Sequence, residues 1–233
     1  YKRDNNEFYS RSRMTIKYEG VFVKAKHFHT TIKIFVCLIV NVGMLSANHV
    51  FAGGDIEAGK AKSQVCSACH GQDGNSANPE WPSLAGQHEK YFITTLESYT
   101  NGTRNNTIMY PLAMTLSEQD MMDLAAYYQT QAPVKKTYDY ELAKQGESLY
   151  RGGNSSGVAA CIACHGPTGR GNPGAAYPSI AGQHSAYTKI ALNEYINGNR
   201  KPGINNMMQT ITPRMTAEEI EAVAEYIQAL EAN

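Results

Sequence analysis

The pentapeptide C-x-x-C-H occurs twice in this chain of 233 residues, as CSACH at 66–70 and CIACH at 161–165. Two cysteines one helical turn apart can add their thiols across the two vinyl groups of one haem, and the adjacent histidine can then ligate the iron. The motif is typical of covalent haem attachment. We therefore expect two haem c groups. The residues expected to bind them are Cys66, Cys69, Cys161 and Cys164 as thioether donors, and His70 and His165 as iron ligands.

Similar sequence follows both motifs. WPSLAGQH at 81–88 is matched by YPSIAGQH at 177–184, and TLSEQDMMDLAAYY at 115–128 is matched by RMTAEEIEAVAEYI at 214–227. Each unit is about 90 residues long, which is the size of a domain and too long for a solenoid repeat. We predict a duplicated domain with one haem per copy, an N-terminal domain over 53–133 and a C-terminal domain over 134–233.

The first 52 residues resemble a leader. Residues 34–45 (IFVCLIVNVGML) form an apolar run, lysines precede it, and Ala52 is a small residue just before Gly53 and Gly54. Such a run is too short for a membrane span and is typical of a signal-peptide core. We predict export to the periplasm with cleavage after Ala52. An uncleaved N-terminal anchor is the alternative.

The charge balance changes when the leader is set aside. Residues 1–52 hold eight of the 21 basic and three of the 21 acidic residues, so the remainder has 13 basic and 18 acidic residues and a formal charge of −5. An acidic surface argues against nucleic acid as a partner. The only cysteine outside the two motifs, Cys37, lies in the leader, so no disulfide framework is expected.

The periodicity of the mature chain predicts helices and gives little indication of strands. Apolar positions after Ser117 and after Thr216 fall on one helical face, and Thr216 to Glu219 has the pattern of a capping box, with Ser117 to Asp120 a weaker relative. Asn-Gly pairs end the middle helices. We predict two all-α domains joined by a linker over 131–140. Further helices are expected over 55–67, 88–99, 141–151 and 184–196, with a loop before Cys161.

C-x-x-C also occurs in zinc sites and in redox-active dithiols. A zinc site needs four ligands close together, and the first unit supplies only Cys66, Cys69 and His88 besides His70. A redox dithiol of the thioredoxin type needs a βαβ context, which is missing. The histidine directly after each motif favours haem.

The second axial ligand of each iron is inferred from the repeat. His88 and His184 are equivalent, so bis-histidine ligation is one alternative. When Ser117 is aligned with Thr216, only Met109 and Met208 form a shared methionine position. We therefore predict Met109 and Met208 as axial ligands. His/Met ligation raises the haem potential, as expected for an electron carrier. Met114 and Met207 are the fallbacks.

Other paired residues are candidates for supporting roles. We expect the carbonyls of Pro82 and Pro178 to accept from the second ring nitrogen of the proximal histidines and so orient them. Tyr91 and Tyr187 are candidates to hydrogen-bond the haem propionates, with simple packing as the alternative.

On these motifs the chain resembles the cytochrome c4 family over nearly all of residues 54–233. The resemblance rests on the duplicated CxxCH, the repeated P-S-[LI]-A-G-Q-H, the Arg151-Gly-Gly stretch and the methionine placement. It implies two class I cytochrome c domains related by pseudo-twofold symmetry, with crossed first and last helices. Gly59 and Gly146 would allow close approach to the helices that carry Tyr127 and Tyr226. Ser63 occupies a position in that contact where the resemblance predicts an aromatic residue.

The resemblance implies an electron carrier with no catalytic residues, transferring electrons from a quinol-oxidising complex to a terminal oxidase. Peripheral membrane association would then come through these redox partners. One alternative is an electron-accepting subunit of a larger dehydrogenase, such as a flavocytochrome. A dihaem peroxidase or a thiosulfate-oxidising enzyme is another, but each needs an open or unusual iron position, which Met109 and Met208 argue against.

Overall fold

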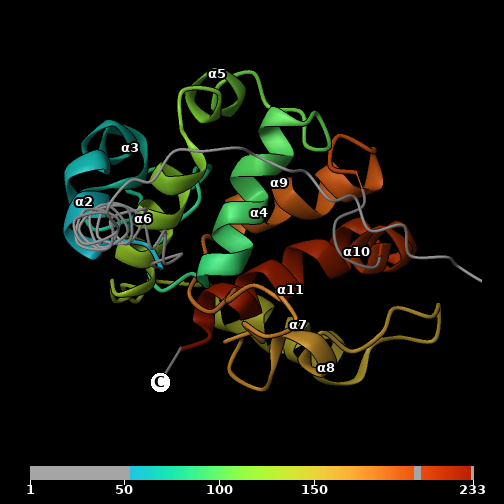
Figure 1. The fold of residues 1–233 in the computed structure, drawn as a ribbon. Coiled ribbons are helices and arrows are strands. Elements are labelled where there is room, and N and C mark those ends of the chain that lie inside the picture. The colour runs from blue at the N-terminus through green and yellow to red at the C-terminus, as the bar shows by residue number, and fades with distance from the viewer. Residues whose placement is uncertain (1–52, 202–205, 232–233) are drawn as a thin grey trace, which may run out of the picture. The chain divides into compact units, whose positions relative to one another are not determined.

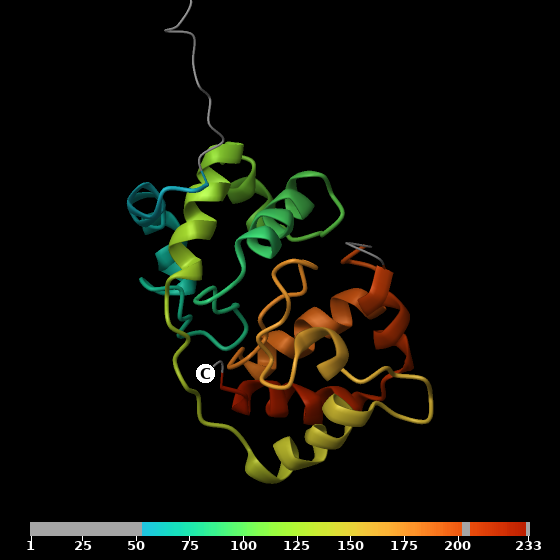
Figure 2. The ribbon, with the colours of Figure 1, turned by 60° about the horizontal axis from the view of Figure 1, so that its bottom comes forward.

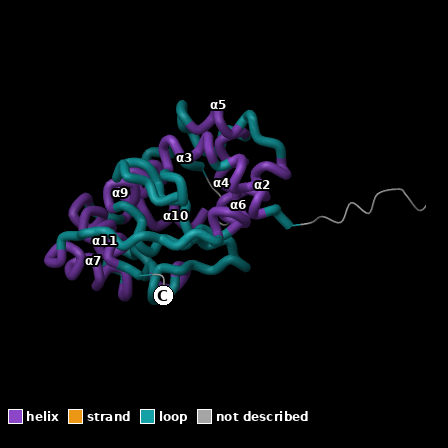
Figure 3. Tube along the Cα trace, turned by 90° about the vertical axis from the view of Figure 1, so that its left-hand side faces the viewer, coloured by secondary structure: helices purple, strands orange, loops and turns teal. Residues whose placement is uncertain are grey.

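The computed structural model describes residues 53–201 and 206–231. Within these ranges every regular element is a helix and no strand is present (Figures 1 and 3). The all-α prediction is therefore confirmed. The expected signal peptide and its cleavage site fall outside the described residues. No helix in the described part is long and apolar enough to cross a membrane.

Between residues 53 and 130 the structure describes five helices, which form the first half. They are α2 (Ile56–Lys62), α3 (Gln64–His70), α4 (Glu89–Thr100), α5 (Met109–Ala113) and α6 (Glu118–Gln129). The single helix expected over 55–67 is instead interrupted at Ser63. The buried Ser63 hydroxyl donates to the Lys60 carbonyl at 2.8 Å, which offers the backbone an alternative to the helical bond there.

The second half repeats this order. It contains α7 (Tyr140–Gly152), α8 (Ile162–His165), α9 (Ser185–Ile196), α10 (Met207–Ile211), the 3-10 helix η2 (Thr212–Arg214) and α11 (Ala217–Ala229). The inserted loop separates α7 from α8, as the sequence predicts. The short helices α5, α8 and α10 were not predicted, because each is too brief to show a helical period.

Both final helices begin with a capping box. The Thr216 side chain accepts from the Glu219 N–H and the Glu219 carboxylate accepts from the Thr216 N–H. Ser117 and Asp120 form the same two bonds at the start of α6. The shorter Asp side chain therefore performs the role that Glu has in the second half.

Each half has its own hydrophobic core, and in each half the first helix crosses the last (Figure 2). The buried cluster of the first half comes mainly from α4 and α6, whereas that of the second half joins α7, α9 and α11. In the first half a Cβ on Gly59 would lie 2.0 Å from the Asp123 carbonyl oxygen. In the second a Cβ on Gly146 would lie 2.0 Å from the Ala222 carbonyl oxygen. Only glycine fits at either crossing, so the close approach to the helices of Tyr127 and Tyr226 is present in both halves.

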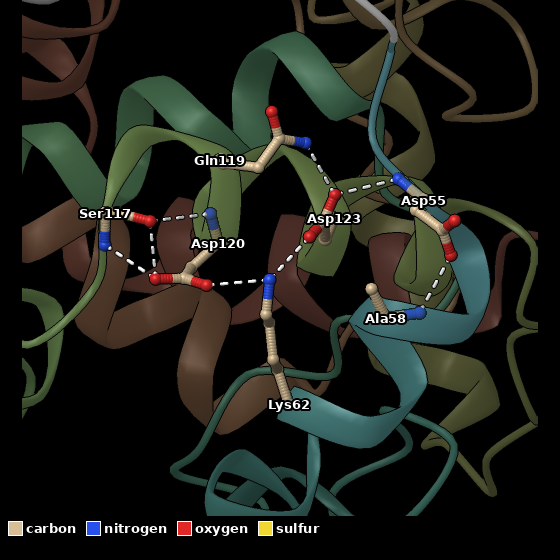
Figure 4. Close-up of polar contacts among 7 residues, drawn as sticks. All are labelled: Asp55, Ala58, Lys62, Ser117, Gln119, Asp120 and Asp123. Carbon is tan, nitrogen blue, oxygen red and sulfur yellow. Dashed lines mark hydrogen bonds and ion pairs between the residues drawn. The ribbon is translucent and has the colours of Figure 1, made fainter.

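The crossing in the first half carries an additional polar tether, shown in Figure 4. The Lys62 ammonium on α2 lies between the carboxylates of Asp120 and Asp123 on α6, 2.7 Å from the Asp120 Oδ1. The buried Asp123 also accepts from the Asp55 N–H at 2.8 Å and from Gln119. The tether therefore fixes the beginning and the end of α2 to α6.

Candidate functional site

The first motif lies on α3, with His70 as its last residue. The His70 side chain is buried, and its Nδ1 lies 2.8 Å from the Pro82 carbonyl oxygen. A carbonyl can only accept, so Nδ1 carries the proton and Nε2 keeps its lone pair available for iron. Burial lowers the pKa of His70 and outweighs the opposing effect of the Pro82 carbonyl, which keeps the imidazole neutral.

His165 has the same environment on α8. Its ring is buried, and its Nδ1 lies 3.0 Å from the Pro178 carbonyl oxygen. Burial again lowers the histidine pKa against the opposing effect of that carbonyl. Both hydrogen bonds expected from the sequence are present, so two neutral, oriented imidazoles occur at equivalent places in the repeat.

The four motif cysteines are free and half-buried. Burial is the largest influence on Cys66 and raises its thiol pKa, and it raises the pKa of Cys161 to about 11. A zinc ligand or a redox-active thiol needs a readily formed thiolate. In the described ranges no three His, Cys, Asp or Glu side chains are grouped to hold a metal ion. These environments disfavour the zinc and dithiol alternatives.

The two methionines predicted as axial ligands pack against the same cores as the first cysteine of each motif. Met109, the first residue of α5, packs against the core of the first half together with Cys66. Met208 on α10 packs against the core of the second half together with Cys161. Of the fallbacks, Met114 is 55 % exposed and so points away from the first core.

His88 and His184 have a different role from the one that bis-histidine ligation requires. Both are N-cap residues, of α4 and α9, and neither side chain caps its helix. His88 Nε2 donates to the Arg170 carbonyl at 2.6 Å, and His184 Nε2 donates to the Ser76 carbonyl at 2.8 Å. Each histidine thus bonds the opposite half of the chain, which favours methionine as the second ligand.

The donor sets in both halves fit a covalently bound haem. Each offers two accessible thiols one turn apart, a neutral histidine with an unprotonated Nε2, and a thioether on the same core. A histidine and a methionine would fill both axial positions of the iron, while the thiols would form the covalent links.

Tyr91 and Tyr187 contact arginines from the opposite half. Arg200 Nη2 donates to the Tyr91 hydroxyl at 2.7 Å, and Arg104 Nη2 donates to the Tyr187 hydroxyl at 3.0 Å. Each tyrosine acts as the acceptor, so its own O–H remains for another partner. Their predicted contact with haem propionates stays a prediction. The repeat shows both arginines, but only the structure shows that they cross between halves.

Two glutamines form a reciprocal contact that the sequence reasoning missed. The Gln87 amide accepts from the Ser179 N–H at 3.0 Å and donates to the Ser179 carbonyl at 2.9 Å. The Gln183 amide makes the equivalent pair with Ser83, at 2.9 Å for both bonds. The exact duplication of A-G-Q-H was a signal for this. Such reciprocity is what a pseudo-twofold relation between the halves requires.

Comparison with known proteins agrees with this geometry. The family model described as Cytochrome c matches residues 56–132 and 143–231. The chain is 40 % identical over 209 residues to a protein named cytochrome c4 from Azotobacter vinelandii, covering 85 % of this chain and 99 % of the relative. The crystal structure of reduced recombinant cytochrome c4 from Pseudomonas stutzeri superimposes with a TM-score of 0.74 and 41 % identity, covering 76 % of this chain and all of that one.

A second kind of relative is also similar. A protein from Stutzerimonas stutzeri named thiosulfate dehydrogenase electron acceptor is 36 % identical over 167 residues. That match covers 70 % of this chain and 77 % of the relative. The similarity thus extends to a protein that is named as the electron acceptor of a dehydrogenase.

Proposed function

This chain belongs to the cytochrome c4 family, and from that premise we propose that it shuttles electrons in the periplasm from a quinol-oxidising complex to a terminal oxidase. Membership makes it a dihaem c-type electron carrier without catalysis of its own. Bound haem supplies reversible one-electron exchange at iron. The specific donor and acceptor, and the periplasmic location, are our proposals.

We assign one haem to each half, within domains bounded at 53–133 and 134–233. Cys66 and Cys69 would anchor the first haem, with His70 and Met109 as axial ligands. The equivalent residues of the second are Cys161, Cys164, His165 and Met208. Two filled axial positions leave no open coordination site, so electron transfer is favoured over peroxidase or thiosulfate chemistry.

One observation carries the assignment: both motif histidines are buried, neutral and held through Nδ1 by a proline carbonyl. Such an outer hydrogen bond fixes the ring and strengthens the ligand. A C-x-x-C-H that occurred by chance would have no reason to repeat this environment at both sites.

The test is an optical redox titration of the purified full-length chain with haem quantitation. We expect two haems per chain, the far-red band of methionine-ligated ferric iron and two high potentials. A high-spin spectrum would instead indicate an open iron and an enzyme. A low-spin spectrum without the methionine band would indicate ligation by His88 or His184.

A second candidate is the electron acceptor of a dehydrogenase. It is favoured by the relatives named thiosulfate dehydrogenase electron acceptor, which match 70 % and 82 % of this chain. Native purification separates the two candidates. Co-purification of a stoichiometric dehydrogenase that reduces the haems on addition of its substrate would favour the acceptor. A free cytochrome that is reduced by a quinol-oxidising complex would favour the shuttle.

Export can be tested independently of electron transfer. The proposed cleavage after Ala52 predicts a mature chain that begins at Gly53, which mass spectrometry of the periplasmic protein would detect. A chain that still carries residues upstream of Ile34 would contradict cleavage.

A further inference from the structure

Two arginines meet where the halves of the chain join. The segments around Arg104 and Arg200 pair antiparallel, with the Asn105 N–H donating to the Asn199 carbonyl at 2.8 Å. Each guanidinium stacks over a tyrosine of its own half, Arg104 on Tyr99 at 5.0 Å and Arg200 on Tyr195 at 4.6 Å. Up to this point the cluster obeys the twofold relation.

Its charges do not. The Arg104 side chain, 2 % exposed, donates through Nε at 3.0 Å and Nη2 at 2.7 Å to the same carboxylate oxygen of Glu194. The position equivalent to Glu194 in the first half is Ser98, which carries no charge. Across the described ranges no carboxylate forms an ion pair with Arg200, whose side-chain hydrogen bond goes to the neutral Tyr91 hydroxyl.

The two arginines therefore present different charges to the two cores. Tyr99, beneath Arg104, belongs to the core that packs against Met109 and Cys66. Arg200 has the equivalent place over Tyr195 in the second half. The cation over Tyr99 in the N-terminal half is paired with a carboxylate, whereas the cation over Tyr195 in the C-terminal half forms no ion pair among the described residues. A nearby cation favours the reduced form of iron, because reduction removes one positive charge from the centre.

We propose that Glu194 is a positioning residue that sets the two haem potentials apart, by neutralising Arg104 on the N-terminal side while Arg200 stays uncompensated. The inference rests on the proposed binding of one haem in each half. The interface would then differ in charge between the two halves, although the two C-x-x-C-H motifs are equivalent. Burial strengthens the effect, since charges removed from water are poorly screened.

The test compares two substitutions in the full-length holoprotein. Glu194→Gln leaves the Arg104 charge bare, so we expect the potential of the N-terminal haem to rise more than that of the C-terminal haem. Ser98→Glu places the missing carboxylate opposite Arg200, so we expect the potential of the C-terminal haem to fall. Glu97→Gln is the matched control, because it removes an equal charge from an exposed position next to Ser98.

Each haem can be followed through the NMR signals of its own axial methionine during the titration, with the Met109→Leu variant for assignment. A Glu194→Gln shift no larger than that of Glu97→Gln would overturn the inference, as would equal shifts at both haems. A lower melting temperature with unchanged potentials would also overturn it and leave Glu194 a purely structural role. If the unsubstituted protein lacks two methionine-ligated haems, the proposed function fails, and this is seen before any variant is compared.

Discussion

Each motif histidine is oriented by a single backbone carbonyl. Pro82 and Pro178 have no N–H of their own and a restricted φ, so their carbonyls are held in place by the local chain. The histidine Nδ1 atoms lie 2.8 Å and 3.0 Å from these oxygens. The proline that orients each motif histidine therefore lies close to it in the sequence, twelve or thirteen residues further along the chain.

The methionine assignment gives a prediction at this scale. Met109→Leu removes the thioether from the first core but keeps an apolar side chain of similar volume. We expect the far-red band to lose about half of its amplitude and the potential of one haem to fall, because one of two methionine ligands is lost. An optical redox titration measures both.

Met114→Leu is the control, because that side chain is exposed and lies in the next turn of the same segment. Its spectrum should match the parent. If Met114→Leu abolishes the band and Met109→Leu does not, the assignment is wrong.

At the scale of elements, both domains rely on the crossing of a first and a last helix. A glycine at each crossing brings helix backbones together, so that any Cβ there would overlap a carbonyl oxygen. Backbone cannot move aside as the end of a flexible side chain can, and a substitution must therefore separate the two helices.

Gly146→Ala tests the crossing of α7 and α11. The added methyl would lie 2.0 Å from the Ala222 carbonyl oxygen, and we expect the free energy of unfolding to fall by about 1–3 kcal/mol. Gly152→Ala is the control within the same helix, because nothing lies within 4 Å of its Cβ position. Denaturant titration of both variants makes the comparison, and equal stabilities would contradict tight packing at Gly146.

The tether on α6 makes the first half sensitive to acid. The Lys62 ammonium and the Ser117 hydroxyl and N–H lower the pKa of Asp120 well below its usual range. Burial alone would raise the pKa of Asp123, but hydrogen bonds from Lys62, Asp55 and Gln119 outweigh it and lower that pKa. Carboxyl groups with lowered pKa values stabilise the fold above their ordinary pKa near 4, and this stabilisation is lost as the pH falls through the lowered values.

Lys62→Gln should therefore lower the melting temperature at pH 7, and the difference from the parent should shrink as the pH falls below about 4. Lys60→Gln on the same helix is the control, because Lys60 is exposed and forms no ion pair among the described residues. Melting curves from pH 7 to pH 2 provide the measurement. A difference that stays constant with pH would show that Lys62 contributes through packing alone.

At the scale of the whole molecule, a set of polar side chains joins the two halves. Hydrogen bonds of these side chains cross between the halves. They come from the glutamines of the two A-G-Q-H motifs, from the two N-cap histidines and from the two arginine–tyrosine pairs. Polar contacts of this kind hold register and orientation, since each hydrogen bond needs one specific partner geometry. The interface therefore fixes how the two haem sites face each other.

Removing the reciprocal glutamine contacts should uncouple the halves. Each lost hydrogen bond contributes about 0.5–1.5 kcal/mol, so Gln87→Ala/Gln183→Ala is expected to turn a single calorimetric transition into two. Gln145→Ala, at an exposed position on α7, should leave the transition unchanged. One cooperative transition in the double variant would show that the remaining contacts suffice for coupling.

The sequence by itself determined the features that depend on local spacing. Three features can be recognised without coordinates: the pairing of two cysteines with the next histidine, the duplication, and the capping residues Ser117 and Thr216. Each acts through neighbours within a few turns or through a repeat. The role of the glycines at 59 and 146 follows instead from the family resemblance. The proline carbonyls were also within reach, since they recur at nearly the same distance from each motif.

Only the tertiary structure decided which groups meet across the two halves. The sequence leaves His88 and His184 as alternative iron ligands, and the structure adds that their Nε2 atoms bond carbonyls of the opposite half, which favours methionine. The pairing of Arg104 with Glu194 joins positions 90 residues apart, and no periodicity in the sequence predicts it. Local spacing fixes what a segment can bind, but a buried charge takes its partner from whichever segment the packing brings next to it.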